Sequence, residues 1–238
     1  MSESVYLGLL LFTLNTVQAQ YTDSLQTQRH QVEFKYKRLY LPAGLMTAGI
    51  VLDTSRKESI KNEVVEERNE HLFSFQNHID DYAQFAPLAA VYGFELAGMD
   101  ARTDWKNRTA ILLKGQLLNL GMVYILKTSL KKIRPDGTAY SFPSGHTANA
   151  FAGATILSIE YGERYQWVPY ASYSLATGIG AMRMANNKHY ISDVIFAAGL
   201  GILSMKVAYW THQYRWNKVQ ASSDPMQMIY TTAALTKP

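Results

Sequence analysis

His189 and Asp193 stand four residues apart in the segment RMANNKHYISD, which also contains Arg183. On a helix this spacing places the two side chains on one face, where the carboxylate can hold one imidazole nitrogen. The other nitrogen is then free to act as a base or a nucleophile. Taken alone, the pattern is as typical of a surface ion pair at the start of a helix as it is of a catalytic pair.

A second candidate group lies in SFPSGHTANAFAGA, residues 141–154. Ser144 fits the N-cap of a helix, and Gly145 allows the backbone to approach a ligand closely. The free N–H groups and the positive end of the helix dipole form an anion site, at which His146 can donate a proton to a bound oxyanion. Alone, this stretch is also typical of a capped helix with an incidental histidine.

The third group is KTSLKKIRP, in which Lys127 and Arg134 are seven residues apart. Two helical turns would bring these side chains to nearly the same face, and Pro135 would end the helix. The segment therefore predicts two cations at one helix exit. A basic cluster at the edge of a membrane would produce the same pattern.

Together, three cations and a helix N-terminus suit a tetrahedral anion such as phosphate, and two histidines supply a nucleophile and an acid. In this order and spacing, K-x6-R-P, P-S-G-H and R-x5-H-x3-D resemble the three-part signature of the type 2 phosphatidic acid phosphatase (PAP2) superfamily, over residues 82–210. That superfamily also contains bacterial acid phosphatases and vanadium haloperoxidases. Met182 stands where the family usually has Ser, so a hydroxyl that could support the phosphate or Arg183 is missing.

The resemblance implies a metal-free phosphatase without a cofactor, in which His189 attacks phosphorus and forms a phosphohistidine. Asp193 would orient His189, and His146 would protonate the leaving oxygen and later activate water. The phosphoryl oxygens would be held by Lys127, Arg134, Ser144, Gly145 and Arg183.

These residues need a scaffold, and five apolar helical stretches follow residue 81. They cover residues 82–99, 109–126, 146–161, 167–184 and 191–210, and each lies near the length of a membrane span. We therefore expect an all-α bundle of five to six transmembrane helices with a PAP2-like core at 82–210 and a tail at 211–238. The mean hydropathy of −0.14 leaves a soluble helical bundle open.

The N-terminal part is different in character. Residues 1–19 are typical of a secretory signal peptide, although the absence of Lys and Arg before the apolar run leaves an uncleaved anchor open. Residues 20–81 are polar apart from an apolar helix at 41–52, which is short for a span of about 20 residues and is expected to be interfacial or re-entrant. The charged stretch 53–81 indicates a solvated helix.

Loop charges predict the orientation. The basic segments ARTDWKNR, YGERY and HQYRWNK fall on one side if every stretch spans, and this side would be cytoplasmic. The candidate site would then face the periplasm of a bacterial inner membrane, where a lipid phosphate could reach it laterally. Undecaprenyl pyrophosphate, phosphatidylglycerol phosphate, phosphatidate and lipid A phosphates are candidates within the family.

Composition narrows the alternatives. The absence of cysteine excludes disulfides, Cys-ligated zinc and a thiol nucleophile, and the net charge of +4 suits an anionic partner. A soluble periplasmic acid phosphatase is the nearest alternative, followed by a haloperoxidase and a non-catalytic binder of anionic lipids. Nucleic acid is not expected as a partner, because Trp210, Tyr214 and Trp216 resemble an interfacial belt more than a stacking platform.

Overall fold

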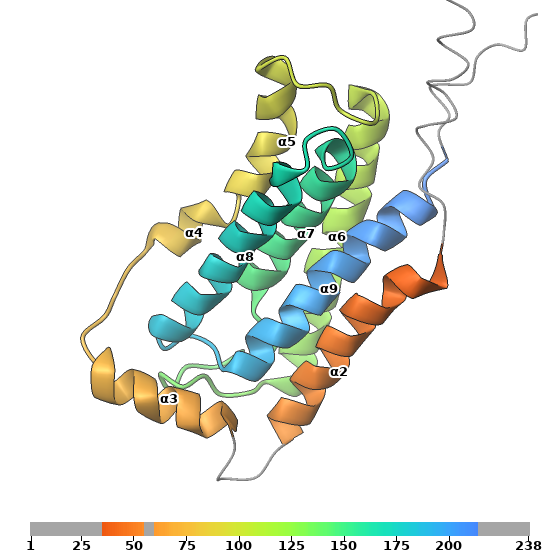
Figure 1. The fold of residues 1–238 in the computed structure, drawn as a ribbon. Helices are drawn as coiled ribbons and strands as arrows, with labels where there is room; N and C mark the ends of the chain where they lie inside the picture. The colour runs from red at the N-terminus through yellow and green to blue at the C-terminus, as the bar shows by residue number, and fades with distance from the viewer. Residues whose placement is uncertain (1–34, 55–59, 214–238) are drawn as a thin grey trace, which may run out of the picture. The chain divides into compact units, whose positions relative to one another are not determined.

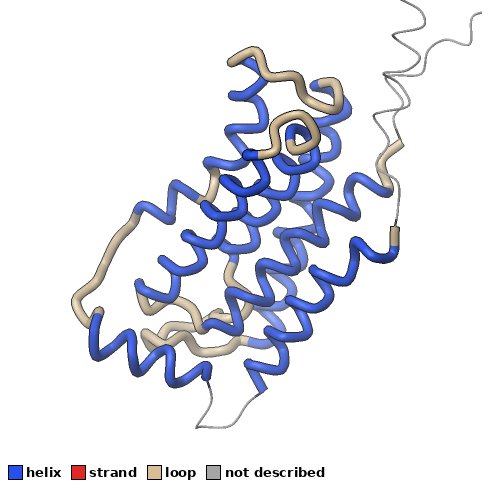
Figure 2. Tube along the Cα trace, in the orientation of Figure 1, coloured by secondary structure: helices blue, strands red, loops and turns tan. Residues whose placement is uncertain are grey.

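The computed structural model describes residues 35–54 and 60–213, and these form helices joined by loops, with one isolated bridge between Ile133 and Ala139 (Figure 2). The expected all-α fold is confirmed. The proposed signal peptide at 1–19 and tail residues 214–238 lie outside the described residues. In chain order the helices are η1 (Tyr36–Leu39), α2 (Tyr40–Thr54), α3 (Ile60–His71), α4 (Ile79–Ala83), α5 (Ala86–Leu96), α6 (Trp105–Leu130), α7 (Gly145–Tyr161), α8 (Trp167–Ala185) and α9 (Ile191–Trp210).

Helix α7 is the centre of the bundle and packs against α5, α6, α8 and α9. Many of its buried side chains are small: Ala148, Ala150, Ala152 and Ala154 have no exposed surface. A Cβ added at Gly201 of α9 would lie 2.3 Å from the carbonyl oxygen of Ala148. The two helices therefore approach closely because small residues face each other.

Helix α2 lies along α9 and runs in the opposite direction (Figure 1). A Cβ at Gly49 would lie 2.6 Å from Cβ of Phe196, and one at Gly199 would lie 2.6 Å from the carbonyl oxygen of Pro42. These two glycines allow α2 to pack lengthwise on α9. The short apolar helix expected at 41–52 corresponds to α2, and its interfacial or re-entrant placement stays a prediction.

The first predicted stretch, 82–99, is divided between two helices. α4 ends at Ala83, and α5 begins at Ala86 with Pro87 in its first turn. Proline restricts the residue before it and lacks an N–H, so a helix readily begins there and does not continue through it. At the other end α5 stops at Leu96, and Gly98 has a φ of 85° that L-residues rarely adopt.

Helix α6 is longer than predicted at both ends. The carboxylate of Asp104 accepts hydrogen bonds from the N–H groups of Lys106 at 3.0 Å and Asn107 at 3.1 Å, and so caps the helix before residue 109. The helix ends at Leu130, where Lys131 is left-handed with a φ of 46°. Pro135 is therefore not the residue that stops it, and Arg134 lies in the following loop instead of on the face that carries Lys127.

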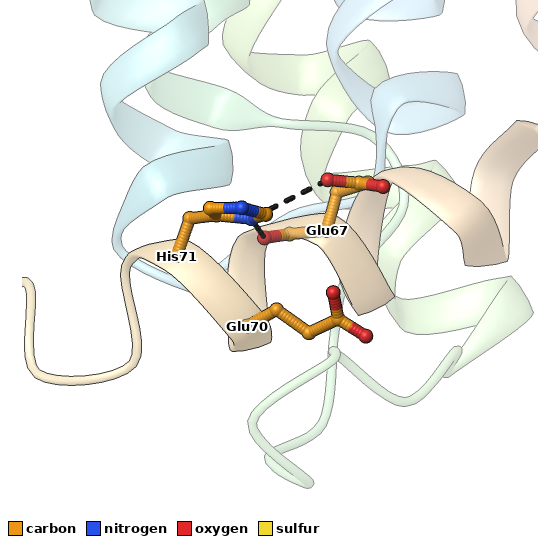
Figure 3. A group of neighbouring side chains, drawn as sticks. All are labelled: Glu67, Glu70 and His71. Atoms are coloured by element: carbon orange, nitrogen blue, oxygen red, sulfur yellow. Dashed lines mark hydrogen bonds and ion pairs between the residues drawn. The ribbon is translucent and has the colours of Figure 1, made fainter.

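Helix α3 is solvated along its length, as the charge pattern predicts, and has no buried residue. Glu67, Glu70 and His71 gather on its exposed surface (Figure 3), where Nδ1 of His71 lies 3.4 Å from a carboxylate oxygen of Glu67. An exposed pair with i,i+4 spacing is usual on a solvated helix. We assign no site to this group.

Two helices of the described segments, α6 and α9, are long and apolar enough to cross a membrane. They differ in burial: 22% of the apolar window of α6 is buried, against 67% for α9. Leu113, Leu117 and Ile125 of α6 are among its exposed apolar side chains. By this criterion the structure supports fewer spans than the five stretches predicted.

Candidate active site

The candidate site lies at one end of the bundle, where α6 and α8 end and where α7 and α9 begin (Figure 1). The loop 131–144 and the loop 186–190 close this end, and α3 and α4 lie beside it. Alternating helix directions therefore bring together the three sequence groups, which are separated by up to about 60 residues in the chain.

His189 and Asp193 form the buried pair of the site, with 3% and 0% of their surface exposed. Nδ1 of His189 lies 3.3 Å from Oδ2 of Asp193. Oδ2 also accepts hydrogen bonds from the N–H of Tyr190 at 3.0 Å and from the hydroxyl of Ser141. His189 lies in the loop before α9, so the two side chains do not share a helix face. The carboxylate nevertheless holds Nδ1 of His189, and Nε2 is left available to react.

The environment keeps His189 uncharged. Burial has the largest effect and lowers the pKa of His189 to about 4, with the charges of Lys127 and Arg183 acting in the same direction. The hydrogen bond and charge of Asp193 act in the opposite direction and are outweighed. At neutral pH the imidazole is therefore a free base, as a nucleophile requires.

The three predicted cations surround this pair. Nζ of Lys127 donates to the carbonyl oxygen of Tyr140 at 2.6 Å, which links the end of α6 to the loop. Nε of Arg134 and Nε of Arg183 are buried and have no hydrogen-bond partner among the described residues. Buried donors without partners are uncommon, and an oxyanion placed between them would satisfy both.

The start of α7 matches the prediction in part. Ser144 is fully buried and caps the helix, with its hydroxyl oxygen 3.5 Å from the N–H of Thr147. The same hydroxyl lies 2.8 Å from the hydroxyl of Thr147, so its contacts serve the cap. A Cβ at Gly145 would be 3.6 Å from Val123, an ordinary contact, so packing alone does not require glycine there.

Two acids of α4, Asp80 and Asp81, enter the site and were missed in the sequence. Nη1 of Arg183 donates to Oδ2 of Asp80 at 2.6 Å and to Oδ1 of Asp81 at 3.2 Å. Nε2 of His146 lies 2.9 Å from Oδ1 of Asp81. Neighbouring acids at the end of a charged stretch are common on solvated surfaces, so nothing in the local sequence distinguished this pair.

Further ion pairs fix the loops around the site. Lys188 donates to Asp136 at 2.9 Å; burial would raise the pKa of Asp136, but hydrogen bonds from Lys188 and Thr138 outweigh it and lower the pKa to about 2. Asp53, at the end of α2, pairs with Lys132 and, at 3.0 Å, with Lys61 of α3. The loop 131–140 is thus tied to three other parts of the chain.

Asp80, Asp81 and His146 also lie close enough together to be considered as metal ligands. Both carboxylates, however, already bind the guanidinium of Arg183. A divalent cation at the same oxygens would be repelled by that charge. The donor set therefore fits an arginine-bound acid pair better than a metal centre.

The described residues are thus all-helical, and the candidate site at one end of the bundle combines cations, a helix N-terminus and two histidines. The model of the PAP2 superfamily matches residues 108–217 of this chain, which contain the three candidate groups.

Two further comparisons found similar proteins. The chain is 42% identical over 139 residues to the lipid A 1-phosphatase of Porphyromonas gingivalis, a match covering 58% of this chain and 31% of that protein. It thus spans about a third of the length of that relative. The crystal structure of Aquifex aeolicus LpxE shares the fold, with a TM-score of 0.50 and 22% identity over 64% of this chain and 96% of that one.

A PAP2-type phosphatidylglycerolphosphate phosphatase from Bacillus subtilis, solved by crystallography, is more distantly similar. Its TM-score is 0.47 and its identity 18%, over 71% of this chain and 94% of that one.

Proposed function

We propose that this protein is a metal-independent phosphatase that hydrolyses a phosphomonoester or pyrophosphate of a membrane lipid. The observation that carries the proposal is the buried, uncharged His189, held through Nδ1 by Asp193 beside two arginines with unpartnered Nε groups. A protein that only binds an anionic lipid would need the cations but not the histidine and aspartate pair. A neutral imidazole oriented by a carboxylate adds a nucleophile.

The reaction proceeds in two balanced steps. In the first, Nε2 of His189 forms a bond to phosphorus while the bond to the leaving oxygen breaks, and His146 gives that oxygen its proton. In the second, water gives a proton to His146 and attacks phosphorus, the P–N bond breaks, and inorganic phosphate leaves. Lys127, Arg134 and Arg183 neutralise the equatorial oxygens, which is the main requirement of phosphoryl transfer.

A lipid substrate is supported by two apolar surfaces. The outer face of α6 exposes large aliphatic side chains, as expected of a helix in contact with acyl chains. An apolar groove of about 210 Å³ is lined by Pro87, Phe94, Leu157, Trp167 and Leu175, among others. Its lining comes from α5, α7 and α8 and contains none of the site residues, so we take it as an apolar surface for acyl chains beside the bundle.

We propose that the end of the bundle that carries the site faces the periplasm. Arg102, Arg164 and the basic pair Lys37 and Arg38 of η1 belong to the end of the bundle opposite the site. Nζ of Lys206 in α9 donates to the carbonyl oxygen of Arg38 at 2.9 Å, which fixes η1 at that end. Basic residues collect on the cytoplasmic side of membrane proteins.

Phosphate release tests the proposal. The purified full-length chain is given a panel of detergent-dispersed lipid phosphates, lipid pyrophosphates and water-soluble phosphomonoesters. We expect release from the lipids at much higher kcat/KM than from soluble esters. Higher kcat/KM for the soluble esters would favour the alternative of a non-specific acid phosphatase, and release from none would contradict the proposal.

A further inference from the structure

Asp81 is the acid that lies nearest the second histidine of the site, and its side chain is 42% exposed. Its Oδ1 is 2.9 Å from Nε2 of His146 and 3.2 Å from Nη1 of Arg183. Its other oxygen faces His78, at 3.3 Å, on the exposed side. Asp81 is therefore partly exposed to solvent beside His146, whereas its neighbour Asp80 is fully buried.

Asp81 keeps its negative charge in this position. Burial would raise the pKa of Asp81, but the hydrogen bonds from His78 and His146 and the charges of His146 and Arg183 outweigh it, and the net shift is downward. The positive charge of Arg183 is shared with Asp80, to which Nη1 is closer at 2.6 Å. A partly exposed carboxylate thus lies beside His146.

The carboxylate of Asp81 lies on the side of the site where the leaving group would depart, if the protein is the phosphatase proposed above. In-line attack by His189 places the leaving oxygen on the far side of phosphorus, next to His146. Asp81 is then one imidazole ring away from the leaving group and not from the transferred phosphoryl group, which the three cations hold. A charged group on the substrate close to the leaving oxygen therefore interacts electrostatically with the carboxylate of Asp81, with little protein between them.

We propose that Asp81 determines which leaving groups the site accepts: it favours phosphomonoesters whose leaving group carries a cation or no charge close to the ester oxygen. Leaving groups with a negative charge there are disfavoured, as when a pyrophosphate is cleaved. The substrate class is thereby narrowed from lipid phosphates in general to phosphomonoesters, with those next to an ammonium group preferred.

Two lipids that differ only in this charge test the inference. Sphingosine 1-phosphate has an ammonium group on the carbon next to the ester carbon, and N-acetylsphingosine 1-phosphate has a neutral amide there. Both are dispersed in the same neutral detergent, and kcat/KM is measured for the wild type, Asp81→Asn and Asp81→Glu. Glu70→Gln, which removes an exposed acid of α3, is the matched control for loss of charge.

The ratio of interest is kcat/KM for the cationic lipid divided by kcat/KM for the neutral lipid. We expect Asp81→Asn to lower this ratio by at least about threefold, because the variant loses the attraction between a half-exposed carboxylate and the ammonium group of the substrate. Asp81→Glu and Glu70→Gln should keep the wild-type ratio, and added salt should reduce the wild-type ratio. If Asp81 acted only by assisting His146 as an acid, Asp81→Asn would raise the ratio, because the amide lipid has the poorer leaving group.

An unchanged or increased ratio in Asp81→Asn would overturn the inference while leaving the proposed phosphatase intact. Failure of the wild type to release phosphate from either lipid would also overturn the inference, because the preferred substrate class would not be cleaved, whereas the panel of lipid phosphates decides the proposed function separately.

Discussion

At the scale of single residues, the reactivity of the site depends on a histidine that burial keeps neutral. The pKa of His189 is about 4 in the folded chain, against an ordinary value of 6.5, because desolvation outweighs the attraction of Asp193. A nucleophile of this kind is available over the whole physiological pH range. The same burial makes the folded state sensitive to acid.

We therefore predict that stability falls as the pH is lowered from about 6.5 to 4. In this window the unfolded chain binds a proton at position 189 and the folded chain does not, so protonation favours unfolding. The full shift corresponds to about 3 kcal/mol. Melting temperatures of the wild type and His189→Asn in detergent measure it, and an equally large loss in both proteins would contradict the assignment.

The acids of α4 show why sequence motifs did not identify every residue of the candidate site. The Lys-Arg, Ser-Gly-His and Arg-His-Asp groups were predicted because each is compact in sequence. Asp81 meets His146 across 65 residues and Arg183 across 102, and only the turn of the chain into α4 creates these contacts. Long-range contacts of this kind leave no periodicity in a single sequence.

At the scale of elements, close helix contacts hold the site together. The site residues come from the ends of α6, α7, α8 and α9, so their positions depend on how closely α7 and α9 pack. Gly201 and the alanines of α7 make that approach possible. Small residues at this crossing thus position the ends of the helices that carry the candidate site.

Two glycine substitutions should have effects of opposite sign. Gly201→Ala places a Cβ against the backbone of Ala148, and we expect it to lower the free energy of unfolding by about 2 kcal/mol. Gly178→Ala in α8 meets nothing within 4 Å and should raise it by up to about 1 kcal/mol, since alanine is the better helix former. Thermal or denaturant unfolding of both variants checks this, and a stable Gly201→Ala would contradict the packing described.

Helix ends were predicted less well than helix cores. The left-handed Lys131 ends α6 four residues before Pro135, and a lysine there gives no warning of a helix end. Ser144, in contrast, was recognised as a cap because its side chain has the required chemistry. A side-chain cap has a recognisable chemistry, although the cap at Asp104 was missed, whereas the end at Lys131 has no side-chain cap and leaves no such signal.

At the scale of the whole molecule, we propose that the bundle lies in a membrane with the candidate site at its outer face. The exposed leucines of α6 and the apolar groove beside α5 support this placement. The low mean hydropathy of −0.14 is explained in part by the polar N-terminal segment and by α3, which is solvated.

Extraction of cell membranes separates the proposed placement from a soluble one. We expect the protein to remain in the membrane fraction through washes with high salt and alkaline carbonate and to be released by detergent, because an apolar helix surface must stay covered. A soluble marker protein should be released by the first wash. Recovery of this chain in the carbonate supernatant would favour the soluble phosphatase.

The central claim is that His189 attacks phosphorus without help from a metal, and one assay tests it most directly. Inorganic phosphate released from detergent-dispersed phosphatidate is measured in excess EDTA for the wild type, for His189→Ala and for His71→Ala, which changes an exposed histidine of α3. The account predicts undiminished release by the wild type and His71→Ala, and none by a folded His189→Ala. Release by His189→Ala within a few-fold of the wild type, or a loss in EDTA that magnesium restores, would contradict it.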